Sequence, residues 1–190
     1  MASEMSVSHW RAGARPGADR EVAPEAAWYA VWTRSHCEQL VRDQLAAMSF
    51  RPFLPTLETW SRRNGSRHRI HLPMFPGYLF VHHALDKYSY VDILKARGVV
   101  GLLGGNWSQL WPIPDEEIEA VSRAADSGLP VVVHPYLSNG NRVRIVGGPL
   151  QGLEGFFVRS KPNLGLVVLC VHLLKRSVAV EVDCTLVERV

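Results

Sequence analysis

Short apolar runs separated by glycine fill the C-terminal part of the chain and limit what it can fold into. The segment RVRIVGGPLQGLEGFF, residues 142–157, contains four glycines and one proline among residues that otherwise favour strands. Its first four residues alternate between basic and apolar side chains, which predicts a strand with one exposed and one buried face. The segment therefore predicts short strands joined by tight turns.

Two glycines of this segment are expected at corners of the backbone. Gly152 and Gly155 bracket Leu153-Glu154, and glycine allows a left-handed or tightly curved backbone that a Cβ atom would oppose. The runs LGLVVLCVHLL and SVAVEVD supply the remaining strands. About 50 residues of this kind predict a five-stranded SH3-like β-barrel, because closing a sheet removes the exposed edges of a small domain.

The preceding part of the chain alternates strand and helix patterns. WYAVWTR has the composition of a strand, and Ser35 with Glu38 predicts a capping box at the start of a helix of about three turns. An arginine-rich stretch with Asn64-Gly65 at its centre predicts a polar hairpin tip before the strand Phe75–His83. Further patterns predict a helix at YSYVDILKA, a strand at VVGLLG and a helix at PDEEIEAVSRAAD. The order β-α-β-β-α-β-α is typical of an antiparallel sheet with flanking helices, so the fold class is α+β.

Composition shifts mark the domain boundaries. Residues 1–26 are polar and rich in Ala, Gly and Pro, which predicts a disordered N-terminal extension without a signal peptide. SGLPVVVHPYLSNG has neither a helical nor a clean strand period and predicts a linker over residues 127–139. We therefore expect an N-terminal domain at 27–126 and a C-terminal domain at 140–190, with few contacts between them.

Composition also argues against several classes of function. The three cysteines lie far apart without zinc-ligand spacing, so we expect no metal site, and they suit a reducing cytoplasm. No apolar run approaches the roughly 20 residues of a membrane helix. Motifs of nucleophilic, metal-dependent or phosphate-binding active sites are missing from the sequence. We expect a cytoplasmic monomer that is not an enzyme and needs no cofactor.

The positive charge of the chain is concentrated locally. The formal net charge is only +3, but no acidic residue lies between Glu58 and Asp86. Four arginines and two histidines fall within the ten positions 62–71. Because the distribution of charge matters more than its sum for nucleic-acid binding, these residues predict a local basic patch.

Two motifs, in this order along the chain, resemble the NusG family of transcription elongation factors. FPGYLFV, preceded by a basic hairpin and by WYAVWTR, is similar to the N-terminal (NGN) domain of that family. The pattern GxRVRIxxGPLxGLEGxxV, followed by VAVEVD, is similar to its KOW motif and barrel. The two motifs together cover roughly residues 28–190. The resemblance implies a transcription elongation and antitermination factor.

In this family the N-terminal domain binds RNA polymerase and bridges its DNA cleft. The resemblance implies an apolar pocket for the clamp helices, a coiled coil of the largest polymerase subunit, with the β subunit across the cleft. Carried over by motif, the pocket residues are Trp32, Phe75, Tyr78, Ile118 and Val121.

The same resemblance implies a contact with the non-template DNA strand. By their positions the residues involved are Arg34, His36 and Arg97, at strand or helix ends that the family turns toward this strand. Arginine there would add salt-dependent affinity for phosphates. The hairpin arginines at 62–69 would face DNA or the β-subunit side of the cleft.

The KOW barrel of the family recruits a partner, which is ribosomal protein S10 or the terminator factor Rho. The corresponding turn of this chain consists of Leu173, Leu174, Lys175 and Arg176. An aliphatic side chain thus stands where NusG commonly has the aromatic anchor of a Phe-Gly-Arg turn. Lys95-Ala96 likewise stands where pause-promoting members have Asn-Thr. The second departure argues against base-specific pausing. The run LPMFPGYLFV and the turn LLKRSVAVEVD resemble specialised paralogues of the RfaH, LoaP and UpxY kind, which antiterminate on a few long operons.

A ribosome-associated or general RNA-binding KOW protein remains the alternative. KOW barrels also occur in ribosomal proteins, and Arg142 and Arg144 make one strand of the predicted barrel basic. A ribosomal KOW protein lacks the N-terminal domain, so the first part of the chain distinguishes the two functions.

Overall fold

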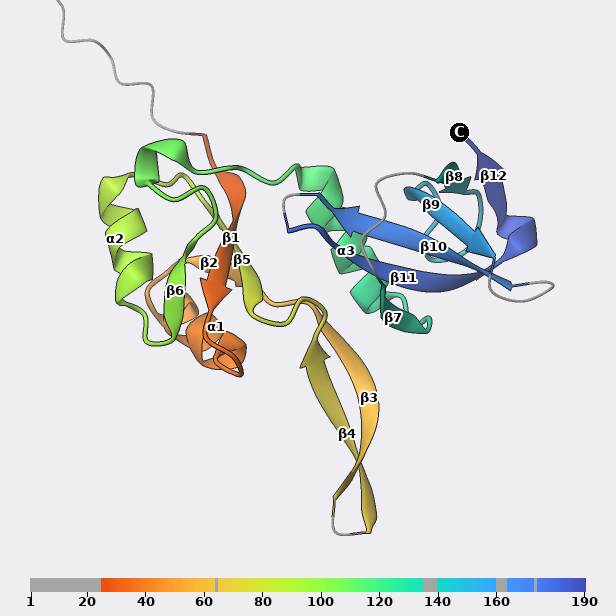
Figure 1. Cartoon of the computed structure of the whole chain (residues 1–190), viewed down its shortest axis with the longest axis horizontal. Coiled ribbons are helices and arrows are strands. Elements are labelled where there is room, and N and C mark those ends of the chain that lie inside the picture. The colour runs from red at the N-terminus through yellow and green to blue at the C-terminus, as the bar shows by residue number, and fades with distance from the viewer. Residues whose placement is uncertain (1–24, 64, 135–139, 160–163, 173) are drawn as a thin grey trace, which may run out of the picture.

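Two β-sheets, three α-helices and a projecting hairpin form the described part of the computed structural model (Figure 1). The structure describes residues 25–63, 65–134, 140–159, 164–172 and 174–190. The predicted extension as far as residue 24, residues 135–139 of the predicted linker, Asn64 and Leu173 lie outside the described residues. The predicted α+β class is confirmed.

The first sheet has four antiparallel strands in the order β2-β5-β1-β6. They are β1 (Ala27–Thr33), β2 (Arg51–Phe53), β5 (Tyr78–His83) and β6 (Val99–Leu102). The central strands β1 and β5 pair from Ala27 opposite His83 to Trp32 opposite Tyr78. This is the antiparallel sheet that the sequence predicts.

The two faces of the first sheet pack against different helices. Since side chains alternate along a strand, Val31 and Ala30 of β1 point to opposite faces. Val31 packs with the helices α1 (Glu38–Ala47) and α2 (Lys87–Lys95), in a cluster whose fully buried members include Val41, Leu45, Leu79, Val81 and Ile93. Ala30 and Phe80 belong to a second cluster, which contains α3 (Asp115–Asp126).

The helix starts differ from the prediction. The capping box expected at Ser35 is wrong, because α1 begins after Cys37 and Glu38 is engaged elsewhere. A capping box starts α2 instead, where Ser89 N donates to Asp86 Oδ1 at 2.7 Å and Asp86 N donates to Ser89 Oγ at 2.8 Å. The bonds from the Ser89 side chain and then its amide hold the pKa of the Asp86 carboxyl below its ordinary value.

The basic stretch forms a hairpin with a sheet of its own. Its strands β3 (Thr56–Arg63) and β4 (Ser66–Pro73) project from the body of the molecule (Figure 1). They pair from Thr56 opposite Pro73 to Arg63 opposite Ser66, which confirms the predicted hairpin. The predicted element order is nevertheless wrong, since it lacks two strands. The apolar alternation of this segment is limited to Leu57, Ile70 and Leu72, so cross-strand backbone pairing defines the full length of these strands.

The second sheet has six antiparallel strands in the order β12-β8-β9-β10-β11-β7. They are β7 (Val131–His134), β8 (Asn141–Ile145), β9 (Glu154–Arg159), β10 (Leu164–Val171), β11 (Arg176–Asp183) and β12 (Val187–Arg189). Two 3-10 turns, Trp107–Gln109 and Cys184–Leu186, lie between elements. Among the described residues, the pairings leave β12 and β7 as outer strands, so a closed SH3-like barrel is not confirmed.

Part of the predicted linker belongs to the second sheet. The strand β7 pairs with β11 from Val131 opposite Val180 to His134 opposite Ser177. The expectation that residues 127–139 contain no strand is therefore wrong for these positions. An edge strand of four residues is fixed mainly by its partner, so its own sequence gives a weak signal.

The two glycines expected at corners behave differently. Gly152 has a φ of +88°, in the left-handed region that was expected. Gly155 lies within β9 and its φ is outside the left-handed region. The prediction that a backbone corner requires glycine at this position is therefore wrong. A Cβ atom at Gly155 would lie 2.6 Å from the carbonyl oxygen of Val168, so the close approach of β10 is what requires glycine there.

The helix α3 lies between the two sheets (Figure 1). One cluster of buried side chains contains Phe75 and Phe80 of the first part, Ile118, Val121 and Ala124 of α3, and Val143, Val167 and Leu169 of the second sheet. The expectation of few contacts between the two parts is therefore wrong. We call this cluster the shared core, and the cluster under α1 and α2 the local core.

Candidate functional site

The predicted pocket residues gather around one end of the shared core. Phe75, Ile118 and Val121 are buried members of it, at 1%, 3% and 0% exposure. The ring of Phe75 meets Phe80 edge-on at 5.7 Å, and the half-buried Tyr78 packs against the same cluster. Trp32 lies opposite Tyr78 on the neighbouring strand and is 48% exposed, so it is the accessible member of the group.

A buried carboxylate positions the turn that carries two of these residues. In the turn Phe75–Tyr78, Tyr78 N donates to Phe75 O at 2.9 Å. Gly77 N donates to Glu38 Oε1 at 2.7 Å, and Thr33 N donates to Gly77 O at 2.8 Å. Sequence reasoning missed this role of Glu38. A detectable signal was its place on the apolar face of α1, three residues before Val41.

Polar contacts of α3 fasten the second sheet to the shared core. Arg123 Nη2 donates to the carbonyl oxygens of Gln151 at 2.7 Å and Pro149 at 3.3 Å. The Glu117 carboxylate accepts from His172 N at 3.1 Å, and its Oε1 lies 2.7 Å from His172 Nδ1. The second sheet is thus held against the helix that carries Ile118 and Val121.

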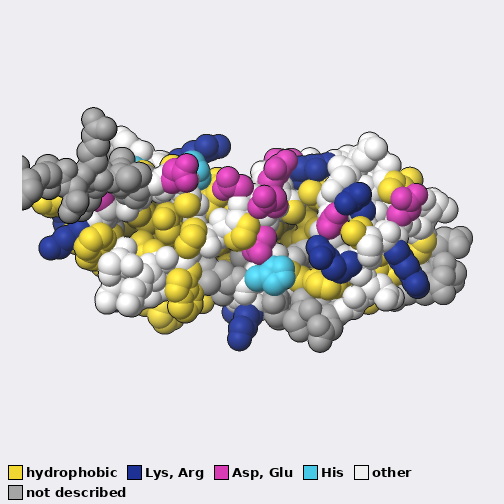
Figure 2. All heavy atoms as spheres, turned by 90° about the horizontal axis from the view of Figure 1, so that it is seen from above, with side chains coloured by type: hydrophobic (Ala, Val, Ile, Leu, Met, Phe, Trp, Pro, Cys, Tyr) yellow, Lys and Arg dark blue, Asp and Glu magenta, His cyan; other side chains and the backbone are white. Residues whose placement is uncertain are grey.

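A groove of about 960 Å³ opens beside this contact. Three glutamates of α3 line one wall, and the second sheet supplies the other with Arg142, Phe156 and His172. In Figure 2, acidic side chains gather in the middle of the visible face, and Lys and Arg side chains lie over the half that carries the second sheet. The predicted site residues do not line this groove in the described part of the chain.

The predicted DNA-contact residues lie at one end of the first sheet. Arg34, His36 and Arg97 are all exposed. Arg34 N donates to Gly98 O at 2.8 Å, which joins the end of β1 to the residue after Arg97. The side chain of Gln44 accepts from Arg97 N and donates to Arg97 O, both at 2.9 Å. The structure therefore brings these three residues to one edge, and Gln44 is a positioning residue that sequence reasoning missed.

The predicted KOW partner turn adjoins α3. Leu173 lies outside the described residues, and Leu174 is buried at 9% exposure in the shared core. Lys175 and Arg176 are exposed. Because His172 binds Glu117, the start of this turn is held at the helix that carries Ile118 and Val121, two of the predicted pocket residues.

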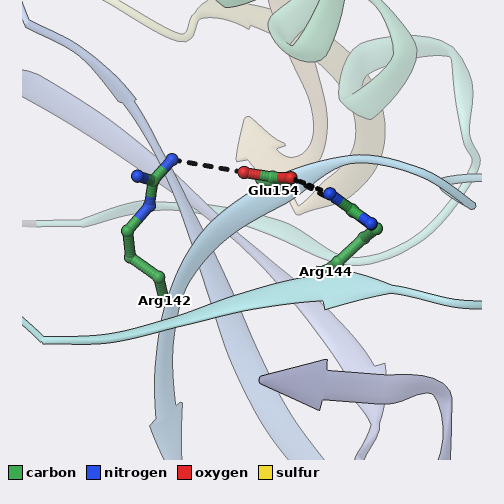
Figure 3. Close-up of polar contacts among 3 residues, drawn as sticks. All are labelled: Arg142, Arg144 and Glu154. Carbon is green, nitrogen blue, oxygen red and sulfur yellow. Dashed lines mark hydrogen bonds and ion pairs between the residues drawn. The ribbon is translucent and has the colours of Figure 1, made fainter. Parts of the chain in front are cut away.

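The basic strand of the second sheet is partly neutralised (Figure 3). Arg144 Nη2 donates to Glu154 Oε1 at 2.6 Å, and Arg142 Nη2 donates to Glu154 Oε2 at 3.2 Å. The hydrogen bond from Arg144, with the charges of both arginines, holds the pKa of the Glu154 carboxyl below its ordinary value. The two guanidinium groups therefore share one carboxylate.

Two kinds of feature are absent from the described residues. None of the helices in these ranges combines the length and apolar character needed to cross a membrane. The described side chains also contain no group of three or more His, Cys, Asp or Glu that could hold a metal ion.

Comparison with known proteins gives matches along most of the chain. The family model "Transcription termination factor nusG" matches residues 26–122. The chain is 30% identical over 173 residues to the transcription termination/antitermination protein NusG of Pseudomonas aeruginosa, covering 86% of this chain and 98% of that protein. It is 25% identical over 177 residues to the protein of the same name from Escherichia coli, covering 88% and 98%.

A solved structure shares the fold. "Domain interaction in Thermotoga maritima NusG" aligns with a TM-score of 0.56 and 22% identity, covering 87% of this chain and 98% of that chain. At this identity the likeness concerns the arrangement of the elements alone.

Proposed function

The chain belongs to the NusG family of transcription termination and antitermination factors, and from this premise we propose that it binds RNA polymerase through its N-terminal domain during elongation. One observation carries the proposal. The turn Phe75–Tyr78 and the helix α3 meet in a single apolar cluster, with the exposed Trp32 beside it. Large aromatic side chains beside an apolar cluster are typical anchors of protein interfaces. The proposed occupant is the clamp-helix coiled coil of the largest subunit, with the β subunit across the cleft.

We place the non-template DNA strand at the edge formed by Arg34, His36 and Arg97. All three side chains are exposed, and the backbone of the two arginines is fixed by hydrogen bonds to Gly98 and Gln44. Fixed arginines beside the polymerase contact would bind phosphates of the exposed strand.

The second sheet is the proposed KOW domain, a closed SH3-like barrel in the partner-bound protein. Its partner, ribosomal protein S10 or Rho, would bind at the turn that contains Leu174, Lys175 and Arg176. Leu174 is buried in the shared core together with Ile118 and Val121. This arrangement is therefore a closed state. The second sheet must leave α3 before polymerase can reach Ile118 and Val121 or the barrel's partner can reach Leu174.

Antitermination on a few operons, in the manner of specialised paralogues, is the proposed output, and the cytoplasm is its proposed location. The departures at Lys95-Ala96 and at Leu174 support this assignment. The alternative of a ribosome-associated KOW protein loses support in two ways. Arg142 and Arg144 share Glu154, and the family match lies in the N-terminal domain that such a protein lacks.

The test measures binding of the full chain to bacterial RNA polymerase core enzyme. Trp32→Ala removes an exposed anchor and should weaken binding by about 2 kcal/mol, roughly thirtyfold. Trp111→Ala is the matched control, because Trp111 is 58% exposed and is not among the predicted pocket residues. Equal affinities of the two variants would contradict the assigned surface.

A second variant tests the closed state. Glu117→Ala combined with Arg123→Ala removes the polar contacts between α3 and the second sheet. Loss of about 1 kcal/mol from that contact should raise polymerase affinity roughly fivefold. Unchanged or weaker binding would mean that the shared core does not restrict the polymerase surface.

A further inference from the structure

We propose that a segment of this chain's own N-terminal part, HWRAGAR at residues 9–15, docks into the groove between α3 and the second sheet. We call it the docking segment. The groove has a volume of about 960 Å³ and two different walls. One wall is a stripe of α3, and the other is formed by the neighbouring strands β8, β9 and β10. Each wall favours a different part of the segment.

The α3 wall offers negative charge that is not paired. Glu116, Glu119 and Arg123 recur at spacings of three and four residues, which place them on one side of the helix. Glu116 and Glu119 are exposed, and neither has an ion-pair partner among the described residues. The arginines of the groove are already engaged, since Arg123 donates to two backbone carbonyls and Arg142 to Glu154. The groove therefore favours an occupant that brings cations to α3.

The wall from the second sheet contributes an apolar surface. Phe156 of β9 is half-buried and lies directly opposite Arg142 of β8 and Val168 of β10. Directly opposed residues share a face of a sheet, so these three side chains lie together. Ala120 and Cys170, both half-buried, also line the groove. An occupant with an aromatic side chain next to its cations would contact both walls.

The docking segment has this composition. No acidic residue occurs between Glu4 and Asp19, and this stretch contains Trp10, Arg11 and Arg15. Its two arginines match the two unpaired glutamates of α3 in number and sign, and arginine–carboxylate pairs are among the stronger hydrogen-bonded contacts. The indole ring of Trp10 would pack on the aromatic side chain of the second sheet.

The described part of the chain begins near the groove, within reach of the docking segment. Ile113 N donates to Trp28 O at 2.8 Å. Glu25, the first described residue, stands three positions before Trp28, and Glu116 stands three positions after Ile113, so each interval spans at most about 11 Å. The ten residues from Arg15 to Glu25 can span about 33 Å, which is enough to reach the α3 wall. A tethered segment binds at an effective concentration in about the millimolar range, so few contacts suffice.

The test compares two-dimensional NMR spectra of the full chain with those of the double variant Arg11→Gln, Arg15→Gln. At low salt the amide signals of Gly155 and Phe156 in the double variant should lie near their wild-type positions at high salt, because screening also releases the segment. The ratio of docked to undocked chains should fall about fivefold, as expected for the loss of two exposed ion pairs.

Arg20→Gln is the matched control. Arg20 stands between Asp19 and Glu21, so its charge is compensated locally, and its removal should leave the groove signals in place. Unchanged groove signals in the double variant would overturn the proposal. Shifts that grow with protein concentration would also overturn it, because they would assign the groove to a second copy of the chain.

A charge exchange tests whether the contact is direct. Glu116→Lys with Glu119→Lys should release the segment and shift the indole N–H signal of Trp10, which is identified by its loss in Trp10→Phe. Adding Arg11→Glu and Arg15→Glu should return this signal toward its wild-type position. Failure of the exchange to restore the signal would overturn the pairing of these residues. Because polymerase is absent, the outcome is independent of the proposed polymerase contact.

Discussion

The local core and the shared core lie on opposite faces of one four-stranded sheet, yet they connect the molecule in different ways. The local core is closed by α1 and α2, whose sequences flank the strands that they cover. The shared core reaches from Phe80 through α3 to Val167 of the second sheet. One face of the sheet thus stabilises the N-terminal part alone, and the other couples it to the C-terminal part.

The difference explains why several residues of the proposed polymerase contact are buried. Ile118 and Val121 are buried in the shared core together with residues of the second sheet, whereas Trp32 is exposed. The coupling therefore resides in the shared core, and substitutions there should affect both parts of the chain.

The largest expected effect comes from removing one large side chain from each core. Phe75→Ala and Leu45→Ala each empty a site that is at most 1% exposed, and should cost about 3–5 and 2–5 kcal/mol of unfolding free energy. In two-dimensional NMR spectra, Leu45→Ala should shift signals of the first sheet only. Phe75→Ala should also shift those of β10.

This result would correct an interpretation based on the motif alone. The sequence places Phe75 at a turn and predicts a surface contact, but its 1% exposure means that Phe75→Ala also weakens the fold. Signals of β10 that stay in place in Phe75→Ala would contradict the coupling of the two parts.

A smaller effect is expected from adding a side chain where two strands approach. Gly155→Val forces its side chain against Val168 O and Val167 Cγ1, 2.6 and 2.7 Å from the new Cβ, at a cost of about 1–3 kcal/mol. Gly101→Val is the matched control in the first sheet, since a Cβ atom there meets open space among the described residues. Chemical denaturation should separate the two variants; equal stability would show that β10 can yield to the new side chain.

Local patterns explain what the sequence predicted well. The strand β1, the hairpin at Asn64-Gly65 and the three helices follow from composition and turn chemistry within a few neighbouring residues. The family resemblance grouped Phe75, Tyr78 and Ile118, and in the structure all three belong to or pack against one cluster. These features depend on contacts between neighbours in sequence or on a family resemblance.

The features that were missed depend on distant partners. The strand β7 needs β11, and the glycine at 155 is required by β10, whose nearest atom belongs to Val168. The buried Glu38 binds Gly77, which lies 39 positions away. Periodicity carries no information on which distant segment will approach, so these contacts and the closed state could not be predicted.

An intermediate effect is expected where the local core meets the turn that carries Phe75. Glu38→Ala leaves Gly77 N–H without its charged acceptor and should cost about 1.5–3 kcal/mol. Glu38→Gln keeps an oxygen acceptor and should cost less. Thermal unfolding followed by circular dichroism checks the order. An equal loss in the two variants would mean that the negative charge, which both of them lack, matters at this position rather than the oxygen acceptor.

The smallest effect concerns pH and compares one carboxylate in each part of the chain. The pKa values of Asp86, which caps α2, and of Glu154, which joins Arg142 and Arg144, are both lowered. A carboxylate whose pKa is lowered in the folded state adds stability above its ordinary pKa, and this stability is lost as the pH falls through the lowered value. Both groups are exposed, so the loss on acidification from about pH 7 to about pH 3 should be modest.

The two parts should respond to acid through different residues. Each of the two carboxylates contacts only its own element or the neighbouring strand. Asp86→Asn should therefore remove the acid-dependent shift from the NMR signals of α2 alone. Glu154→Gln should remove it from the signals of β8 and β9 alone. If Glu154→Gln left the acid response of β8 and β9 unchanged, its pairing with the arginines would be weak in solution. Arg142 and Arg144 would then be free to bind an anion, and the RNA-binding alternative would regain its support. Retained pairing means that Glu154 compensates one of these two positive charges and leaves the hairpin as the more basic surface.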